Sequence, residues 1–266
     1  LDCAAPRWVF GPEAFPMPRL RALMHNGCWG RLRSCDPPIT VPAWASMLSG
    51  RDPGELGIYG FRNRHDHSYE GMFTANASAI TVPRVWDILS RAGKKVVVLG
   101  VPQTYPVKPV NGWMVSGFLA PDTQSEYTYP RTLKAELETE CGGYIIDVKD
   151  FRTKDKDGLL QRIYALMENR FTVARYLMAT KPWDFFMMVE MGVDRLHHGF
   201  WKYGDPAHPR HEPGNPYSSV LRDYYQVLDQ RIGELIDLAG VDTDVLVVSD
   251  HGAKSMYGGV RINQWL

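Results

Sequence analysis

The residues best suited to chemistry are an acid and an imidazole at the end of an apolar run. Asp250 and His251 directly follow residues 245–249, a short β-branched stretch without helical period, which predicts a buried strand. In an open α/β sheet, reactive groups lie beyond the carboxyl ends of parallel strands. A carboxylate oxygen beside an imidazole nitrogen suits zinc. The alternative is a strand followed by a polar turn that binds nothing.

A second acid and imidazole pair follows another predicted strand, which ends at Glu190. Asp194 and His198 are four residues apart, so on a helix they share one face and can hold one ion, while His197 points elsewhere. The alternative is a surface helix whose first turn is capped by the acid. Since both pairs follow predicted parallel strands, we expect them at one sheet edge. Two ions there, about 4 Å apart, would clamp the attacking and leaving oxygens of a displacement.

Thr40 follows the proline-stiffened loop of residues 35–39 and begins a predicted helix. Its hydroxyl is either an ordinary helix N-cap or a nucleophile. A helix N-terminus offers unpaired N–H groups and a positive dipole to an attacked phosphate, but a threonine hydroxyl needs a base or a metal to become reactive. Asp2 is a further acid, which taken alone predicts a solvated side chain.

Strands and helices alternate along the chain. Continuous apolar strands separated by helices predict a mostly parallel sheet covered on both faces. We expect a single catalytic domain over residues 1–266, cut at both ends, with residues 121–156 as an inserted segment. The patterns predict helices over 18–24, 40–48, 82–91, 131–140, 158–180 and 217–238, and strands over 29–34, 95–101, 113–118, 144–148, 184–190 and 245–249.

Composition excludes several classes of partner. The chain has 266 residues, 44% of them apolar, and a formal net charge of zero, which does not suit a nucleic-acid polymer or an anionic membrane. No apolar run approaches the roughly 20 residues of a membrane span. The four cysteines are scattered and favour free thiols in a reducing compartment, the cytoplasm, with two disulfides as the alternative.

These motifs, taken in order, resemble the alkaline phosphatase superfamily, and within it the type I phosphodiesterase/nucleotide pyrophosphatase family. The resemblance implies an alkaline-phosphatase-like three-layer αβα sandwich with a mostly parallel sheet. It covers nearly the whole chain, and the ordered set is far more specific than any one motif. The matching segments are Leu1-Asp2, Arg33-Ser34, Pro37–Trp44, Leu48–Pro53, Val115–Phe118, Asp194–His198, Ser249–Gly252 and Asn263–Leu266.

The resemblance also implies a role for each site residue. It assigns one metal to Asp2, Asp250 and His251, with Thr40 bound to it as the nucleophile that forms a phosphothreonine, and the second metal to Asp194 and His198. Both ions would be zinc, with manganese or iron as alternatives. Asn63 would bind a phosphate oxygen, in competition with Arg62 and Arg64. The expected substrate is a small phosphoester, with a nucleotide as one candidate.

Two departures from the family pattern leave other interpretations open. The family places a further histidine on the second metal, and no histidine follows His251 here. A sulfatase needs Arg where Ile39 stands after Cys35, so that activity is disfavoured. The alternatives are a phosphomutase or phosphonate hydrolase on the same core, or an inactive module that binds metal.

Overall fold

The computed structural model describes residues 1–66, 68 and 70–265, so the last residue of the Asn263–Leu266 motif lies outside the described residues. The elements, in chain order, are α1 (Pro6–Phe10), α2 (Pro18–Asn26), α3 (Thr40–Ser49), α4 (Pro53–Leu56), β1 (Arg62–Arg64), β2 (Met72–Thr74), the 3-10 helix η1 (Ala77–Ala79), α5 (Val85–Arg91), β3 (Val96–Val101), β4 (Gly112–Ser116), β5 (Thr128–Tyr129), α6 (Thr132–Cys141), α7 (Lys156–Thr180), β6 (Phe185–Met188), α8 (Gly192–Gly204), α9 (Val220–Ala239) and α10 (Ile262–Trp265).

The main sheet has the strand order β5-β4-β3-β6. Strand β3 pairs in parallel with β4 and with β6, and the short β5 adds to β4 in the antiparallel direction. All six residues of β3 are buried, as a continuous apolar run covered on both faces requires. The mostly parallel sheet predicted from the sequence is therefore confirmed.

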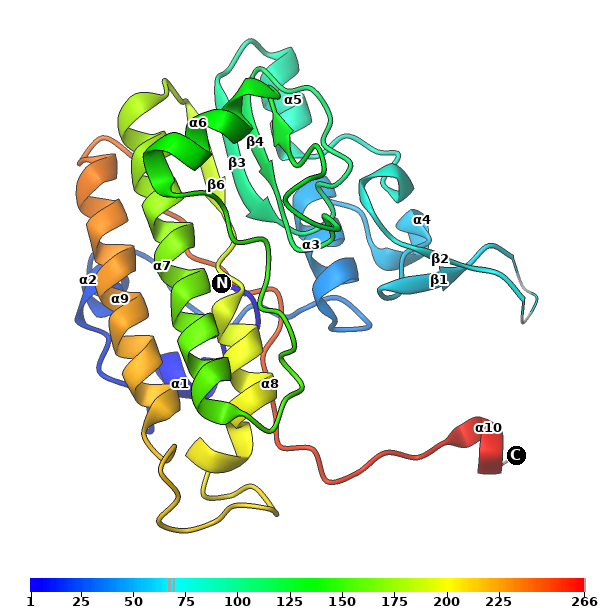
Figure 1. Ribbon diagram of the computed structural model, residues 1–266, viewed down its shortest axis with the longest axis vertical. Coiled ribbons are helices and arrows are strands. Elements are labelled where there is room, and N and C mark those ends of the chain that lie inside the picture. Colours follow the sequence, from blue (N-terminus) through cyan, green and yellow to red (C-terminus); the bar gives the residue numbers. More distant parts are fainter. Residues whose placement is uncertain (67, 69, 266) are drawn as a thin grey trace.

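Helices cover both faces of this sheet (Figure 1). On one face, side chains of α6 and α7 pack on Val97 and Leu99 of β3. On the other, Trp44 of α3 and Trp86 of α5 pack on Val96 and Val98. Because β3 residues alternate between the two clusters, the sheet forms the middle layer of a three-layer αβα sandwich, which confirms the expected fold class.

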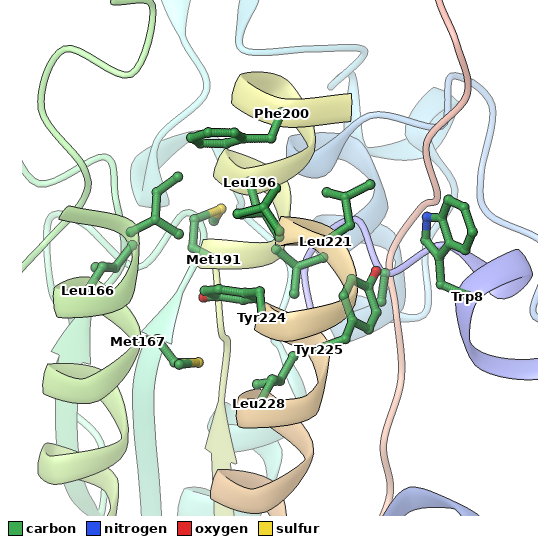
Figure 2. Close-up of a cluster of buried hydrophobic side chains, with 14 of the residues drawn as sticks. Trp8, Leu166, Met167, Met191, Leu196, Phe200, Leu221, Tyr224, Tyr225 and Leu228 are labelled. Carbon is green, nitrogen blue, oxygen red and sulfur yellow. The ribbon is translucent and has the colours of Figure 1, made fainter. Parts of the chain in front are cut away.

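A large apolar cluster joins α7, α8 and α9 (Figure 2). Leu196 and Phe200 of α8 are fully buried between the other two helices, and Tyr224 and Leu228 of α9 are equally buried. Each such side chain contributes roughly 1.5–3 kcal/mol when removed from water. The cluster fixes the orientation of α8, the helix that carries Asp194 and His198.

The predicted strand over residues 245–249 is wrong. These residues form no ladder, and the Leu246 side chain is 84% exposed while Val245 is 40% exposed. A strand needs a hydrogen-bonded partner along its length. Here the amino group of Leu1 donates to Val248 O at 2.8 Å, and no ladder with another described segment continues from that bond. The segment is therefore extended without being a buried strand, although Asp250 at its end is buried.

Two further predicted strands, over residues 29–34 and 144–148, are also absent. In the second, Tyr144, Ile146 and Val148 are buried in alternation, as in a strand. However, the backbone N–H of Ile145 donates to the side chain of Asn169 at 2.7 Å instead of to a neighbouring strand. The alternating pattern therefore predicted the burial correctly, but a side chain takes the place of the ladder.

Residues 1–3 lie between the end of β6 and the segment that leads to Asp250. Asp2 N donates to Glu190 O at 2.9 Å, beside the contact of Leu1 with Val248. The chain thus brings its first acid to the same edge as the residues that follow β6. Among the described helices, none combines the length and apolar character needed to cross a membrane.

Candidate metal centre and active site

Thr40 is the first residue of α3, and its hydroxyl faces the carboxyl edge of the sheet. The helix is capped by Ile39 without a side-chain hydrogen bond, so the N-cap interpretation of Thr40 is wrong. Instead, Thr40 Oγ1 lies 3.0 Å from His251 Nε2 and 3.4 Å from Asp2 Oδ1. One turn further along the same helix face, Trp44 Nε1 donates to Asp2 Oδ2 at 2.8 Å. Helix α3 therefore positions both the hydroxyl and the acid beside it.

Asp2, Asp250 and His251 form one compact group of potential metal ligands. One ligand atom from each lies within 4.8 Å of the others. Burial, followed by the charges of Asp250 and Asp194, raises the pKa of Asp2 well above its ordinary value, and burial raises the pKa of Asp250. Two buried carboxylates at this distance repel each other unless a proton or a cation lies between them.

Asp194 and His198 lie on one face of α8, as their spacing predicts, with His198 Nε2 3.5 Å from Asp194 Oδ1. Glu190 anchors the start of this helix, because its carboxylate accepts from Gly192 N at 2.7 Å and from Val193 N at 3.2 Å. The hydroxyl of Tyr224 also donates to Glu190, at 2.9 Å. A buried acid thus fixes the turn that presents Asp194.

The two acid and imidazole pairs meet at Cys3. Its Sγ, a carboxylate oxygen of Asp194 and a ring nitrogen of His251 all lie within 4.8 Å of one another. Burial and then the neighbouring carboxylates, with Asp194 foremost among them, raise the pKa of the Cys3 thiol. Since His251 belongs to both groups, the ligand sets are adjacent, as the sequence predicts for residues 2, 194, 250 and 251.

A salt-bridge chain supports Asp194 from behind. Arg195 Nη1 donates to Asp194 Oδ2 at 2.6 Å, and Asp147 holds the same guanidinium by two bonds of 2.8 and 2.7 Å. Burial alone would raise the pKa of Asp194, but the hydrogen bond of His198 and the charge of Arg195 hold that pKa below its ordinary value. These contacts therefore favour the ionised form of Asp194 and fix the orientation of its carboxylate.

Part of this cluster, including Cys3 and Asp194, lines a cavity of about 1050 Å³. Its walls include Thr40, His198 and His251, and also the aromatic rings of Phe61, Phe118, Phe151, Trp201 and Tyr257. Cations gather along the same walls, and they are Arg152, Lys156, Lys202, Arg210 and Lys254. The cavity thus combines a reactive end with an aromatic and positively charged wall that suits an anionic molecule.

The structure does not bring Asn63 and Arg62 into this cavity. The Asn63 amide is used within its own loop, since Oδ1 accepts from Tyr59 N at 2.8 Å and Nδ2 donates to Gly60 O at 2.9 Å. Arg62 is exposed on β1, and the cavity walls among the described residues include Phe61 rather than either of these two. Their positions in the loop after α3, together with the charge of Arg62, were the sequence signal for a role in binding.

Three contributors were missed from the sequence: Cys3, His197 and Asp147. Cys3 stands next to Asp2, and that adjacency was the available signal. His197 is buried, with Nδ1 3.5 Å from Cys3 Sγ and Nε2 3.2 Å from the hydroxyl of Tyr225, and burial lowers its pKa to about 3. Asp147 gives no local signal, because its partner Arg195 is 48 residues away.

The residues present fit metal ions. Asp250 Oδ2 is buried, accepts no hydrogen bond from the part of the chain that the structure describes, and faces His251 Nε2 at 3.4 Å. A buried carboxylate oxygen without a donor is costly, and a cation in the group removes that cost. Carboxylate, imidazole and thiol ligands together are typical of zinc rather than magnesium.

An αβα sandwich with this cluster around a helix-start hydroxyl defines the alkaline phosphatase class. The chain belongs to the type I phosphodiesterase/nucleotide pyrophosphatase family, whose profile it matches over residues 1–266. No curated protein matches it.

Solved structures share the fold at low identity. Phosphonoacetate hydrolase from Sinorhizobium meliloti 1021, in complex with phosphonoformate, is 18% identical with a TM-score of 0.56, and the match covers 89% of this chain and 52% of that one. Its complex with phosphonoacetate is 17% identical with a TM-score of 0.53, and the match covers 84% of this chain and 48% of that one. Murine ectonucleotide pyrophosphatase/phosphodiesterase 5 is 14% identical with a TM-score of 0.49, and the match covers 90% of this chain and 50% of that one. The chain spans about half the length of these structures.

Proposed function

We propose that this protein hydrolyses a small phosphoester, a phosphodiester or pyrophosphate in particular, with Thr40 as the nucleophile and two divalent cations as cofactors. The observation that carries the proposal is the position of the Thr40 hydroxyl, 3.0 Å from His251 Nε2 and 3.4 Å from Asp2 Oδ1 at the start of a helix. A hydroxyl in that position has a ligand cluster to activate it and a helix N-terminus to receive a phosphate.

Each of the two proposed cations would have its own set of ligands. Asp2, Asp250 and His251 would hold the first, next to Thr40, and Asp194 and His198 would hold the second. When bound, the pair would supply Lewis acidity to the attacking and leaving oxygens. Zinc is the proposed metal, with manganese or iron as the alternatives.

The chain's own residues orient the phosphate and carry the bond changes. The N–H groups of Thr40 and Val41 begin α3 and have no acceptor within the helix, so they could donate to an oxygen of a bound phosphate. The Thr40 oxygen forms a bond to phosphorus, its proton passes to solvent, and the bond from phosphorus to the leaving oxygen breaks. The leaving oxygen takes up a proton from solvent. Water then attacks phosphorus, the bond from phosphorus to the Thr40 oxygen breaks, and that oxygen recovers a proton as the phosphate product leaves.

The cavity favours a substrate with an aromatic or otherwise bulky group next to the phosphate. Rings such as Phe118 and Phe151 lie on its walls, and its volume of about 1050 Å³ exceeds what inorganic phosphate needs. Nucleotide esters and pyrophosphates combine flat rings with anionic groups, and are therefore our leading substrate candidates.

The test is Thr40→Ala with an aryl phosphodiester as substrate. We expect hydrolysis to be lost while bound metal, measured by elemental analysis, is unchanged. The matched control is Ser49→Ala at the other end of the same helix, which should retain full turnover, because the Ser49 hydroxyl donates only to Ala45 O within α3, at 2.7 Å. Undiminished turnover in Thr40→Ala would overturn Thr40 as the nucleophile.

Parallel assays separate the alternatives that share this core. Turnover of phosphonoacetate would favour a phosphonate hydrolase, and conversion between phosphosugar isomers would favour a phosphomutase. Stoichiometric metal with no turnover of any of these substrates would favour an inactive metal-binding module.

A further inference from the structure

We propose that Cys3 is a thiolate ligand of the cation that Asp194 binds, at the point where His251 also approaches, and that His197 holds this thiolate in place. The inference rests on the two-cation site of the proposed function and adds a sulfur ligand to it. It would make the second position a mixed sulfur, nitrogen and oxygen site.

Distance supports this role for Cys3. Its Sγ lies within 4.8 Å of both a carboxylate oxygen of Asp194 and a ring nitrogen of His251. Ligand atoms of one tetrahedral zinc ion, each about 2.0–2.3 Å from the metal, lie roughly 3.3–3.8 Å apart, so a bound cation would draw these side chains slightly closer together. The thiol also lines the cavity, so a cation that enters from solvent can reach it.

The backbone of Cys3 is held in a conformation that side chains seldom adopt. Its φ is +64°, in the left-handed region, and its N–H donates to Asp250 Oδ1 at 3.0 Å. Glycine would adopt this φ without steric cost, whereas a residue with a Cβ is strained. The thiol is the group that cysteine adds at this position, and the backbone directs it to the ligand cluster.

A second observation points to missing positive charge directly beside this group. Asp250, whose Oδ1 binds the backbone of Cys3, has a buried Oδ2 that accepts no hydrogen bond within the described residues. That oxygen faces the His251 ring, which belongs to the group containing Cys3. The cluster therefore lacks positive charge where the thiol meets it.

A buried chain of contacts holds the sulfur from behind. His197 Nδ1 lies 3.5 Å from Cys3 Sγ, and its Nε2 lies 3.2 Å from the hydroxyl of Tyr225. Figure 2 labels Tyr225 within the apolar cluster, so this chain is anchored in the core. Outer partners of this kind orient metal ligands, and their loss typically lowers metal affinity about 10–100-fold.

A sulfur ligand has a chemical consequence. Thiolates favour zinc over manganese and magnesium, which prefer oxygen ligands. The thiol proton is released to solvent when the cation binds.

The test is the X-ray absorption of the zinc-loaded protein, which reports sulfur ligands directly. A variant with Cys28, Cys35 and Cys141 all changed to Ser leaves Cys3 as the sole cysteine. We expect this variant to show a zinc–sulfur shell at about 2.3 Å. Cys3→Ser should bind zinc without that shell, and its preference for zinc over manganese should fall at least tenfold. His197→Gln should keep the shell and bind zinc about 10–100-fold more weakly.

Zinc that binds to the three-serine variant with oxygen and nitrogen neighbours alone would overturn the role of Cys3 and leave the two-cation proposal standing. Failure of that variant and of the unaltered protein to bind zinc at all would overturn both. Neither outcome depends on the stability of Cys3→Ser, because both are measured on proteins that keep Cys3.

Discussion

The Thr40 hydroxyl and the Nε2 of His251 lie 3.0 Å apart, although 211 residues separate them in the chain. Helix α3 presents the hydroxyl from one layer of the sandwich, and the extended segment after α9 presents the imidazole. Asp2 contacts both residues, at 3.4 Å from Thr40 and 3.6 Å from His251. The proposed nucleophile and a proposed metal ligand therefore meet only in the folded chain.

The metal-free protein should lose stability through Asp2 as the pH rises. Because its pKa is raised well above the ordinary value of 3.8, Asp2 keeps a proton in the folded state that it releases when unfolded. Its contribution to the free energy of unfolding is therefore complete below pH 3.8 and is lost as the pH rises through the folded pKa. The slope reaches at most about 1.4 kcal/mol per pH unit for one proton.

Urea unfolding with a chelator present, compared between the unaltered protein and Asp2→Asn, measures this contribution. The amide introduced by Asp2→Asn keeps an acceptor for Trp44 and cannot ionise, so the stability difference between the two proteins should change with pH. Saturating zinc should reverse the trend, since a cation binds the ionised carboxylate. Parallel stability curves from about pH 4 to 7 would contradict the expected difference in proton binding.

Asp147→Asn should weaken the metal site without touching a ligand. Asp147 makes two bonds to Arg195, which in turn orients Asp194. We expect a loss of about 1–3 kcal/mol in the free energy of unfolding and a fall of roughly tenfold in metal affinity. Denaturant melts and competitive metal titration measure the two effects.

The matched control for Asp147 is Glu55→Gln, which breaks an exposed pair with Arg51. Exposed pairs contribute little, so the change in stability should stay within about 0.5 kcal/mol. Equal effects of the two substitutions would remove any special role for Asp147.

Lys156→Met should raise KM for an anionic substrate and leave kcat unchanged. Burial, and then the charge of Lys202, lowers the pKa of Lys156, so two ammonium groups share one wall of the cavity. A substrate anion relieves that repulsion in the ground state and in the transition state alike. We expect a three- to tenfold rise in KM, about 0.7–1.4 kcal/mol.

Steady-state kinetics at two salt concentrations measure the effect of Lys156→Met, which should shrink at high salt. Lys94→Met is the control, because Lys94 pairs with Asp184 at 3.7 Å beyond the cavity walls. A fall in kcat with constant KM would place Lys156 in the reaction step instead.

Gly192→Ala should damage the start of α8. A Cβ at this position would lie 2.0 Å from Tyr224 Oη and 2.5 Å from Glu190 Oε1, so the carboxylate that anchors the helix would have to move. We expect a loss of about 1–3 kcal/mol in the free energy of unfolding, together with weaker metal binding through Asp194.

Thermal and denaturant unfolding check the Gly192 effect against Gly30→Ala. A Cβ on Gly30 meets no described atom within 4 Å, so this substitution should change stability little. If Gly192→Ala proved as stable as Gly30→Ala, the fixed geometry argued for Glu190 and α8 would be incorrect.

The sequence by itself determined the elements whose signal is local. The apolar run of β3 and the proline-led start of α3 predicted their positions, because backbone period and proline restriction act within a few residues. The spacing of four between Asp194 and His198 likewise placed both on one face of α8. The ordered motifs then indicated the family.

Only the tertiary structure decided which side chains converge. Residues 245–249 carry a strand pattern but have too little partner backbone beside them, so they form no strand. The Asn63 amide is used by its own loop, whereas Cys3 lies at the junction of the two ligand groups. Hydrogen-bond partners and ligand distances depend on segments far apart in the chain, and no local pattern encodes the relative placement of those segments.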